Sequence, residues 1–149
     1  MATMRFNHME LTFPRGTLTP DFRAEVDAFY GDVFGWQGVD AEVVGKLCHI
    51  MLLDGAEQFI LLAEGSKPMS SPGYDHLGLL FSTRAEVDEK LEQVKRHQEK
   101  DDRVTVKEYE DLVNGDFVTH AFYVKHLLPI YFDVQCFERA GQAVPNALS

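Results

Sequence analysis

The chain has 149 residues, of which 45% are hydrophobic and 26% charged, and its formal net charge is −10. A chain of this length can bury roughly 70% of its unfolded surface without disulfides, and its apolar runs are too short to span a membrane. The negative charge repels phosphate, which argues against nucleic acid as a partner, and without an N-terminal signal region we expect a cytoplasmic protein with reduced, buried cysteines.

A first strand is predicted at residues 7–13, which read NHMELTF. Because side chains alternate between the two faces of a strand, Leu11 and Phe13 share one face and His8 lies on the other. Glu10 shares the face of His8, either as a spare ligand or as a solvated side chain. The apolar row is the one that a helix would cover, so His8 is expected on the opposite face.

A helix is predicted after this strand. Thr19 and Pro20 form a cap followed by a proline at the first helical position, and Gly35 ends the helix. Between them the apolar residues recur at helical spacing. Three strand-like segments follow, AEVVG, KLCHIMLLD and EQFILLAEG, so that the order is strand, helix, three strands.

The same order begins again at residues 75–81, DHLGLLF, where His76 lies opposite an apolar row. A second helix is predicted at Thr83, with Glu86 completing a capping box. Both helices contain the string RAEVD, and HIMLLDG aligns with HAFYVKH further on. Three matches in one order predict an internal duplication, with modules at about 4–65 and 74–138 and a flexible tail at 141–149.

The last strand-like segment, PIYFDVQCFE, places one carboxylate among apolar residues. Phe132, Val134 and Cys136 form one row, and Asp133 belongs to the other. Asp133 is therefore expected to face away from the apolar row, as His8 and His76 do. The alternative is a solvated residue on an edge strand.

In this order of segments and in these residues, the chain resembles the vicinal oxygen chelate superfamily, which includes glyoxalase I, bleomycin-resistance proteins and extradiol dioxygenases. The resemblance implies an α+β fold, a single domain at residues 1–140, in which two tandem βαβββ modules form curved sheets around a cleft. It also implies metal ligands on the first strand of each module and on the last strand, at His8, His76 and Asp133. Asp133 departs from the usual Glu, and Leu61 or Leu62 stands where glyoxalase I has another Glu.

Two histidines and one carboxylate would leave open positions on Fe(II), the favoured ion, while Mn, Ni, Co or Zn also suit such ligands. The open positions would take a small-molecule substrate with two adjacent oxygens, which predicts a metal-dependent enzyme of the glyoxalase or dioxygenase type. His120 and Tyr123 are candidate catalytic residues for acid–base or hydrogen-bonding roles. Their odd spacing places them on opposite faces of one strand, so only one of them can face the cleft.

A second hypothesis is a metal-free ligand-binding protein of the bleomycin-resistance type. The acidic balance and the aromatic residues Phe6, Tyr123 and Tyr131 would suit a flat cationic compound. A third is a module whose site has been lost. The resemblance also implies a homodimer, in which the metal site lies within one chain or is shared between two, and it leaves open the role of His49, the counterpart of His120.

Overall fold

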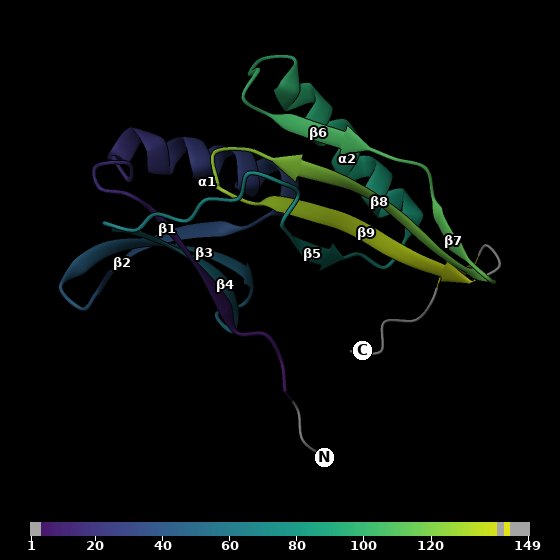
Figure 1. Ribbon diagram of the computed structural model, residues 1–149, viewed down its shortest axis with the longest axis horizontal. Helices are drawn as coiled ribbons and strands as arrows, with labels where there is room; N and C mark the ends of the chain where they lie inside the picture. Colours follow the sequence, from purple (N-terminus) through teal and green to yellow (C-terminus); the bar gives the residue numbers. More distant parts are fainter. Residues whose placement is uncertain (1–3, 140–141, 144–149) are drawn as a thin grey trace. The chain divides into compact units, whose positions relative to one another are not determined.

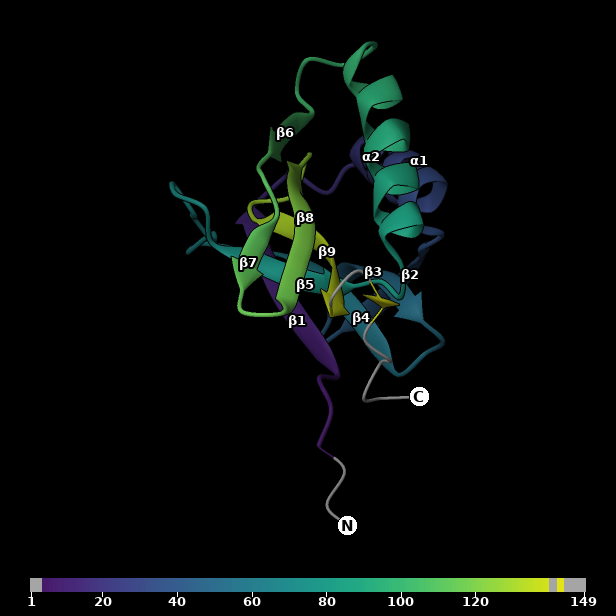
Figure 2. The ribbon, with the colours of Figure 1, turned by 90° about the vertical axis from the view of Figure 1, so that its right-hand side faces the viewer.

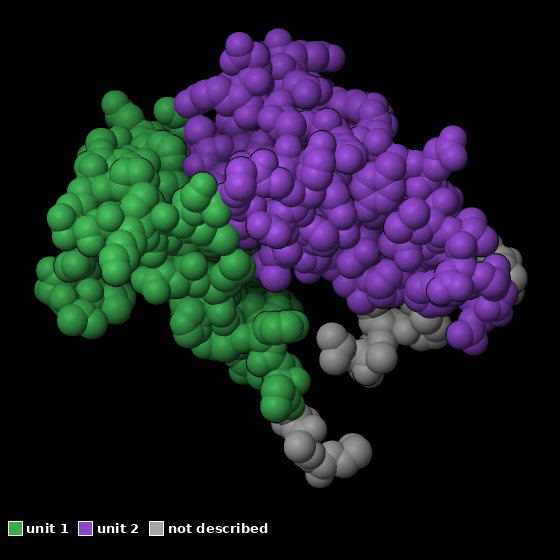
Figure 3. Space-filling view, in the orientation of Figure 1, with its two compact units in different colours: residues 1–70 green, residues 71–149 purple. Residues whose placement is uncertain are grey.

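The computed structural model describes residues 4–139 and 142–143 (Figure 1). The chain divides into two compact units, unit 1 at residues 1–70 and unit 2 at residues 71–149 (Figure 3). In its described part, each unit contains one helix and one β-sheet, in the chain order strand, helix, strands. This confirms the α+β fold and agrees with the repeat predicted from the sequence.

Unit 1 contains a four-stranded sheet and the helix α1 (Pro20–Phe34). Its strands are β1 (His8–Pro14), β2 (Gln37–Val43), β3 (Lys46–Asp54) and β4 (Gln58–Gly65). They lie in the order β1-β4-β3-β2, with β1 parallel to β4 and the other neighbours antiparallel. The register places His8 opposite Phe59 and Asp40 opposite His49.

The ends of α1 follow the signals read in the sequence. The Thr19 side chain accepts a hydrogen bond from the Phe22 N–H, and Pro20 occupies the first helical position. At the other end Gly35 adopts φ 72°, the left-handed conformation that glycine reaches without strain. The helix therefore begins and ends where the sequence predicts.

One face of the unit 1 sheet is covered by α1. Leu11 is fully buried there, and the ring of Phe13 meets the ring of Phe22 with 5.7 Å between centroids. The other buried residues of this core include Val26, Phe29, Tyr30, Val33, Met51, Ile60 and Leu62. His8 lies on the opposite side of β1, on what we call the open face, the face of a sheet not covered by its helix.

Unit 2 repeats this arrangement with a six-stranded sheet and the helix α2 (Arg84–Gln98), which packs against β8 and β9 (Figure 2). Its strands are β5 (His76–Leu80), β6 (Thr105–Glu108), β7 (Leu112–Asn114), β8 (Phe117–Lys125), β9 (Tyr131–Arg139) and β10 (Gln142–Ala143). β5 pairs with β9 in parallel, as β1 does with β4. The first strand after α2 is divided into β6 and β7, which is the main difference from unit 1.

The cap of α2 also follows the predicted capping box. Thr83 Oγ1 accepts from the Glu86 N–H at 3.2 Å, and the Glu86 carboxylate accepts from the Ser82 N–H at 3.0 Å. The first bond satisfies an unpaired N–H of the first helical turn, and the second ties Glu86 to the residue before the cap. Val87 and Val94 bury the helix against the sheet.

Strand β9 alternates between core and open face. Phe132, Val134 and Cys136 are fully buried on the α2 side, whereas Asp133 lies on the open face and is 7% exposed.

Both Cys48 and Cys136 are free buried thiols, and burial raises the pKa of Cys136 to about 11. No described helix is both long and apolar enough to cross a membrane. Of the predicted tail, Gln142–Ala143 pairs with β9 as β10, while residues 141 and 144–149 lie outside the described residues.

Candidate functional site

Four of the five tyrosines of the chain gather beside His76 on the open face of unit 2. The ring centroids lie 5.3 Å apart for Tyr74–Tyr131 and for Tyr109–Tyr123, 6.0 Å for Tyr123–Tyr131 and 6.2 Å for Tyr74–Tyr123. These separations are typical of interacting aromatic pairs. The four rings form one aromatic surface, called the tyrosine face below.

His76 and Asp133 meet on this face. His76 Nε2 lies 3.8 Å from Asp133 Oδ2, and His76 Nδ1 lies 2.8 Å from the Tyr74 carbonyl oxygen. A carbonyl oxygen can only accept, so in the neutral ring Nδ1 carries the proton and Nε2 presents its lone pair toward Asp133. An ionised Asp133 is also an acceptor, and two facing acceptors repel unless a proton or a cation lies between them.

The surroundings of Asp133 make its charge costly. Burial raises the pKa of Asp133, although the Tyr109 hydroxyl, which donates to its Oδ1 at 3.2 Å, favours the charged form, as His76 does when its ring is protonated. Burial and the neighbouring carboxylate in turn raise the pKa of Tyr109 above its ordinary value. Tyr109 therefore stays protonated at neutral pH and remains a donor to Asp133.

The pair fits two positions in the coordination shell of a divalent metal ion. Imidazole nitrogen and carboxylate oxygen suit Fe, Mn, Ni, Co and Zn. Two ligand atoms of one such ion lie roughly 3–3.4 Å apart, so the separation of 3.8 Å needs only a small side-chain rotation. The carbonyl of Tyr74 supplies the second hydrogen bond that metal-binding histidines usually make.

His8, the other predicted ligand, lies in unit 1. Its ring stacks on Phe59 with 4.8 Å between centroids, and its Nδ1 lies 2.5 Å from the Asn7 amide oxygen. Because that oxygen accepts, Nδ1 carries the proton and Nε2 keeps the lone pair, as in His76. Within the described part of either unit, no group of three or more His, Cys, Asp or Glu side chains is placed to hold a metal.

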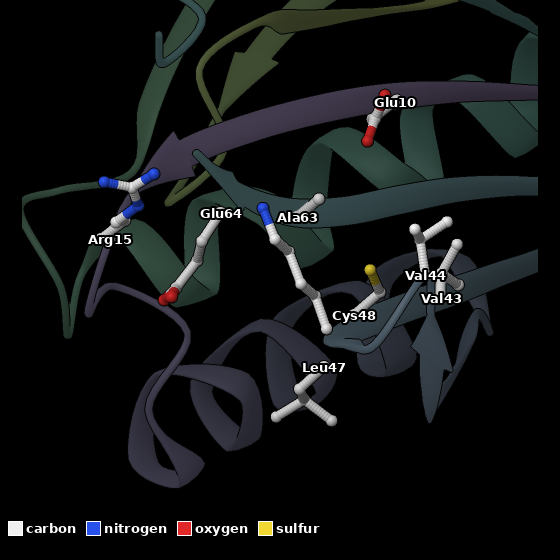
Figure 4. Close-up of a pocket in the computed structure, with 9 residues that line it drawn as sticks. Glu10, Arg15, Val43, Val44, Leu47, Cys48, Ala63 and Glu64 are labelled. Carbon is white, nitrogen blue, oxygen red and sulfur yellow. The ribbon is translucent and has the colours of Figure 1, made fainter. Parts of the chain in front are cut away.

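A depression of about 490 Å³ lies in unit 1 (Figure 4). It is lined by Glu10, Arg15, Val43, Val44, Lys46, Leu47, Cys48, Ala63 and Glu64. Figure 4 shows Arg15 and Glu64 at one end and Val43 and Val44 at the other. The Glu64 carboxylate accepts from the Leu18 N–H at 2.7 Å, and backbone hydrogen bonds hold its pKa below the usual range. Glu64 therefore fastens the loop before α1.

His120 lies on the other side of β8, against α2. Its Nε2 is 2.7 Å from Asp88 Oδ1, and its Nδ1 is 2.7 Å from Asp111 Oδ1. Arg84 joins the same group by ion pairs with Asp111 and Glu138. Burial alone would lower the pKa of His120, but the hydrogen bonds to the two aspartates outweigh it and raise that pKa.

Unit 1 contains the same network. His49 Nε2 lies 2.6 Å from Asp27 Oδ1, its Nδ1 lies 2.7 Å from Asp40 Oδ1, and Arg23 pairs with Asp40. His49 is 3% exposed, and the side chain of His120 is 20% exposed. Each network joins a helix to its sheet.

Sequence reasoning found parts of these networks without joining them. The repeated RAEVD supplies Arg and Asp from each helix, and 111 − 40 and 120 − 49 are both 71, so Asp40 and His49 recur at one offset. This shared offset is the feature of the sequence from which the two networks could have been predicted. Tyr74 and Tyr109 were also missed, because their place on the open face depends on loop conformation.

The two candidate catalytic residues are separated as their odd spacing predicts. The ring of Tyr123 lies 4.8 Å from the ring of His76, on the open face. His120 lies on the α2 side of the same strand. The structure thus brings together His76, Asp133 and Tyr123 and does not place His120 with them.

Residues 18–114 match the protein-family model described as Glyoxalase/Bleomycin resistance protein/Dioxygenase superfamily. No curated protein matches the chain by sequence.

Several solved structures are similar in fold. A glyoxalase family protein from Bacillus anthracis has a TM-score of 0.60 at 16% identity, over 91% of this chain and 96% of that one. FosX from Listeria monocytogenes, in complex with Mn(II) and 1S,2S-dihydroxypropylphosphonic acid, has a TM-score of 0.58 at 16% identity, over 95% of each chain. Lactoylglutathione lyase from Agrobacterium tumefaciens has a TM-score of 0.57 at 19% identity, over 90% and 94%. At such identities the likeness concerns the fold.

Proposed function

Since the chain belongs to the Glyoxalase/Bleomycin resistance protein/Dioxygenase superfamily, we propose that it is a metal-dependent enzyme acting on a small substrate with two adjacent oxygens. His76 and Asp133 would hold the ion, and His8 is the predicted third ligand. The observation that carries the proposal is the facing pair of acceptors, His76 Nε2 and Asp133 Oδ2, 3.8 Å apart on the tyrosine face.

The kind of ion follows from the ligands. When bound, a divalent ion would act as a Lewis acid on a coordinated substrate oxygen. The sequence favours Fe(II), and the Mn(II) bound by FosX supports a divalent ion in this fold. Homodimer formation and a cytoplasmic location stay predictions.

The residues around the proposed metal ligands have distinct roles in this proposal. Tyr74 orients His76 through its carbonyl, and Tyr109 orients Asp133 through its hydroxyl. Tyr123, beside His76, would donate to or accept from the substrate as the acid–base partner. The contacts of His120 with Asp88 and Asp111 support a structural role instead.

A metal-free ligand-binding protein is the second candidate. The tyrosine face favours it, because neighbouring aromatic rings give affinity for a flat ligand without any chemical step. The two functions differ in whether a ligand is consumed.

Turnover of catechols, of 2-oxo compounds and of phosphonates related to the FosX ligand tests the proposal, with Fe(II), Mn(II), Ni(II) or Zn(II) added. We expect metal-dependent turnover that falls at least about 100-fold in His76→Ala and Asp133→Ala, and about 100-fold or more in kcat for Tyr123→Phe. Asp116→Ala, at a carboxylate that is 71% exposed, is the matched control and should act like the native protein. Metal-dependent turnover that survives His76→Ala and Asp133→Ala would contradict the proposal, and saturable binding without turnover would favour the second candidate.

A further inference from the structure

Two lysines lie on the tyrosine face, each with its ammonium group near a tyrosine ring. Lys107 Nζ lies 3.8 Å from the centroid of the Tyr74 ring, and Lys125 Nζ lies 5.3 Å from that of Tyr131. The two rings are neighbours, with centroids 5.3 Å apart. Two positive charges therefore share one patch, held by contacts of the cation–π kind.

Neither ammonium group forms an ion pair within the described part of the chain. Strand alternation sends Glu108 to the α2 side, where it pairs with Lys95 at 3.1 Å, and leaves Lys107 on the open face. Lys125 Nζ donates to the Ser71 carbonyl oxygen at 3.4 Å. Neither Lys107 nor Lys125 meets a carboxylate among the described residues, although the chain carries 24 acidic side chains.

The patch adjoins the proposed metal ligands. Lys107 is directly opposite Tyr123 in the β6–β8 register, and Tyr131 is directly opposite His76 in the β5–β9 register. The hydroxyls of the surrounding tyrosines can donate hydrogen bonds, as the ammonium groups do. A ligand that fills this face therefore meets donors at one end and the metal ligands at the other.

We infer that Lys107 and Lys125 bind an acidic group of the ligand, a phosphonate, phosphate or carboxylate, over the rings of Tyr74 and Tyr131. An anion placed there would relieve the repulsion between the two ammonium groups and accept charge-assisted hydrogen bonds from both. A cationic aromatic compound, the ligand expected for a metal-free binding protein, would be repelled by the same charges. The inference rests on the proposed function in that this acidic group would belong to the substrate whose adjacent oxygens reach His76 and Asp133.

Binding of methylphosphonate to the full chain, freed of metal with a chelator and followed by two-dimensional amide NMR, tests this site. The Lys107→Gln/Lys125→Gln double variant should bind at least about tenfold more weakly than the native protein, because two charge-assisted hydrogen bonds are lost. Lys95→Gln, which removes a lysine of α2 paired with Glu108, should bind within about twofold of native, and the double arginine variant should retain binding. Acetate, tested in the same way, separates a carboxylate site from a phosphonate site.

Three outcomes would overturn the inference. They are no saturable methylphosphonate binding by the native chain, equal binding by the folded double glutamine variant, and tighter binding of tetramethylammonium than of methylphosphonate. Mn(II) binding, measured by electron paramagnetic resonance on the same samples, separates this result from the proposed function. Methylphosphonate binding that needs both lysines, in a chain that binds neither Mn(II) nor Fe(II), Ni(II) or Zn(II), would support the anion site and contradict the metal-dependent enzyme.

Discussion

The orientation of His76 depends on one backbone carbonyl. Hydrogen bonding of Nδ1 to Tyr74 directs Nε2 toward Asp133, and Tyr109 holds the other oxygen of that carboxylate. The strand alternation of His76 and Asp133 could be predicted from the sequence, because it needs only a period of two. Their spacing of 3.8 Å could not, because it depends on the register of β5 against β9, which pairs His76 with Tyr131 and Gly78 with Asp133.

His120 shows the same limit. Its position on β8 could be predicted, but its two aspartate partners come from α2 and from the segment before β7, and local sequence does not show which residues of a helix meet a sheet. These partners make His120 a pH-dependent clamp. Its pKa is raised in the folded chain, so its contribution to stability is complete below the unfolded value of about 6.5 and is lost as pH rises through the folded pKa.

We therefore predict a pH-dependent effect of His120→Gln. The variant should lower the free energy of unfolding by about 1–2 kcal/mol at pH 6, and by less at each step from pH 7 to pH 9. Urea unfolding of both proteins across this range measures the difference. His126, whose pKa is lowered by burial, titrates in both proteins and so cancels. A difference that stays constant or grows with pH would contradict the clamp.

The helices are the elements that the sequence predicts best, because their caps are local. Thr19, Gly35 and Thr83 act where short-range rules place them. The division of the strand after α2 into β6 and β7 could not be predicted from local sequence. It depends on pairing with β8 at two separate places. Gly38 in β2 lies where α1 packs closely on the sheet. A Cβ at this position would overlap the Asp27 carboxylate.

Two glycine substitutions test how α1 is held to its sheet. Gly38→Ala should lower the free energy of unfolding by about 2–3 kcal/mol, because Asp27 must leave His49 to make room. Gly31→Ala, within α1, should raise it by about 0.5–1 kcal/mol, because alanine favours a helix and the new Cβ makes only an ordinary contact at 3.5 Å with the Trp36 carbonyl oxygen. Denaturant unfolding of the two variants gives both values. A Gly38→Ala variant with an unchanged free energy of unfolding would show that the network around Asp27 and His49 is not close-packed.

At the scale of the whole molecule, the duplication explains why the two units carry related polar groups. The Arg–Asp–His–Asp networks recur on the helix side of both sheets, at Arg23, Asp27, Asp40 and His49 and at Arg84, Asp88, Asp111 and His120. The open faces have diverged instead. The tyrosine face and both lysines belong to unit 2 alone, whereas unit 1 presents His8 on Phe59. The two units therefore share the contacts between helix and sheet on their covered faces. The residues of the proposed chemistry lie on the open faces, where the two units differ.

Metal content per chain, in protein purified without oxygen and without a histidine tag, tests the central claim most directly. We expect about one divalent ion per chain in the native protein and in Asp116→Ala, and little in His76→Ala or Asp133→Ala, because either change removes a ligand of the proposed site. His8→Ala should lower the content as well if His8 is the third ligand. A native protein that stays empty after Fe, Mn, Ni and Zn are offered, or variants at His76 and Asp133 that keep their metal, would contradict the account.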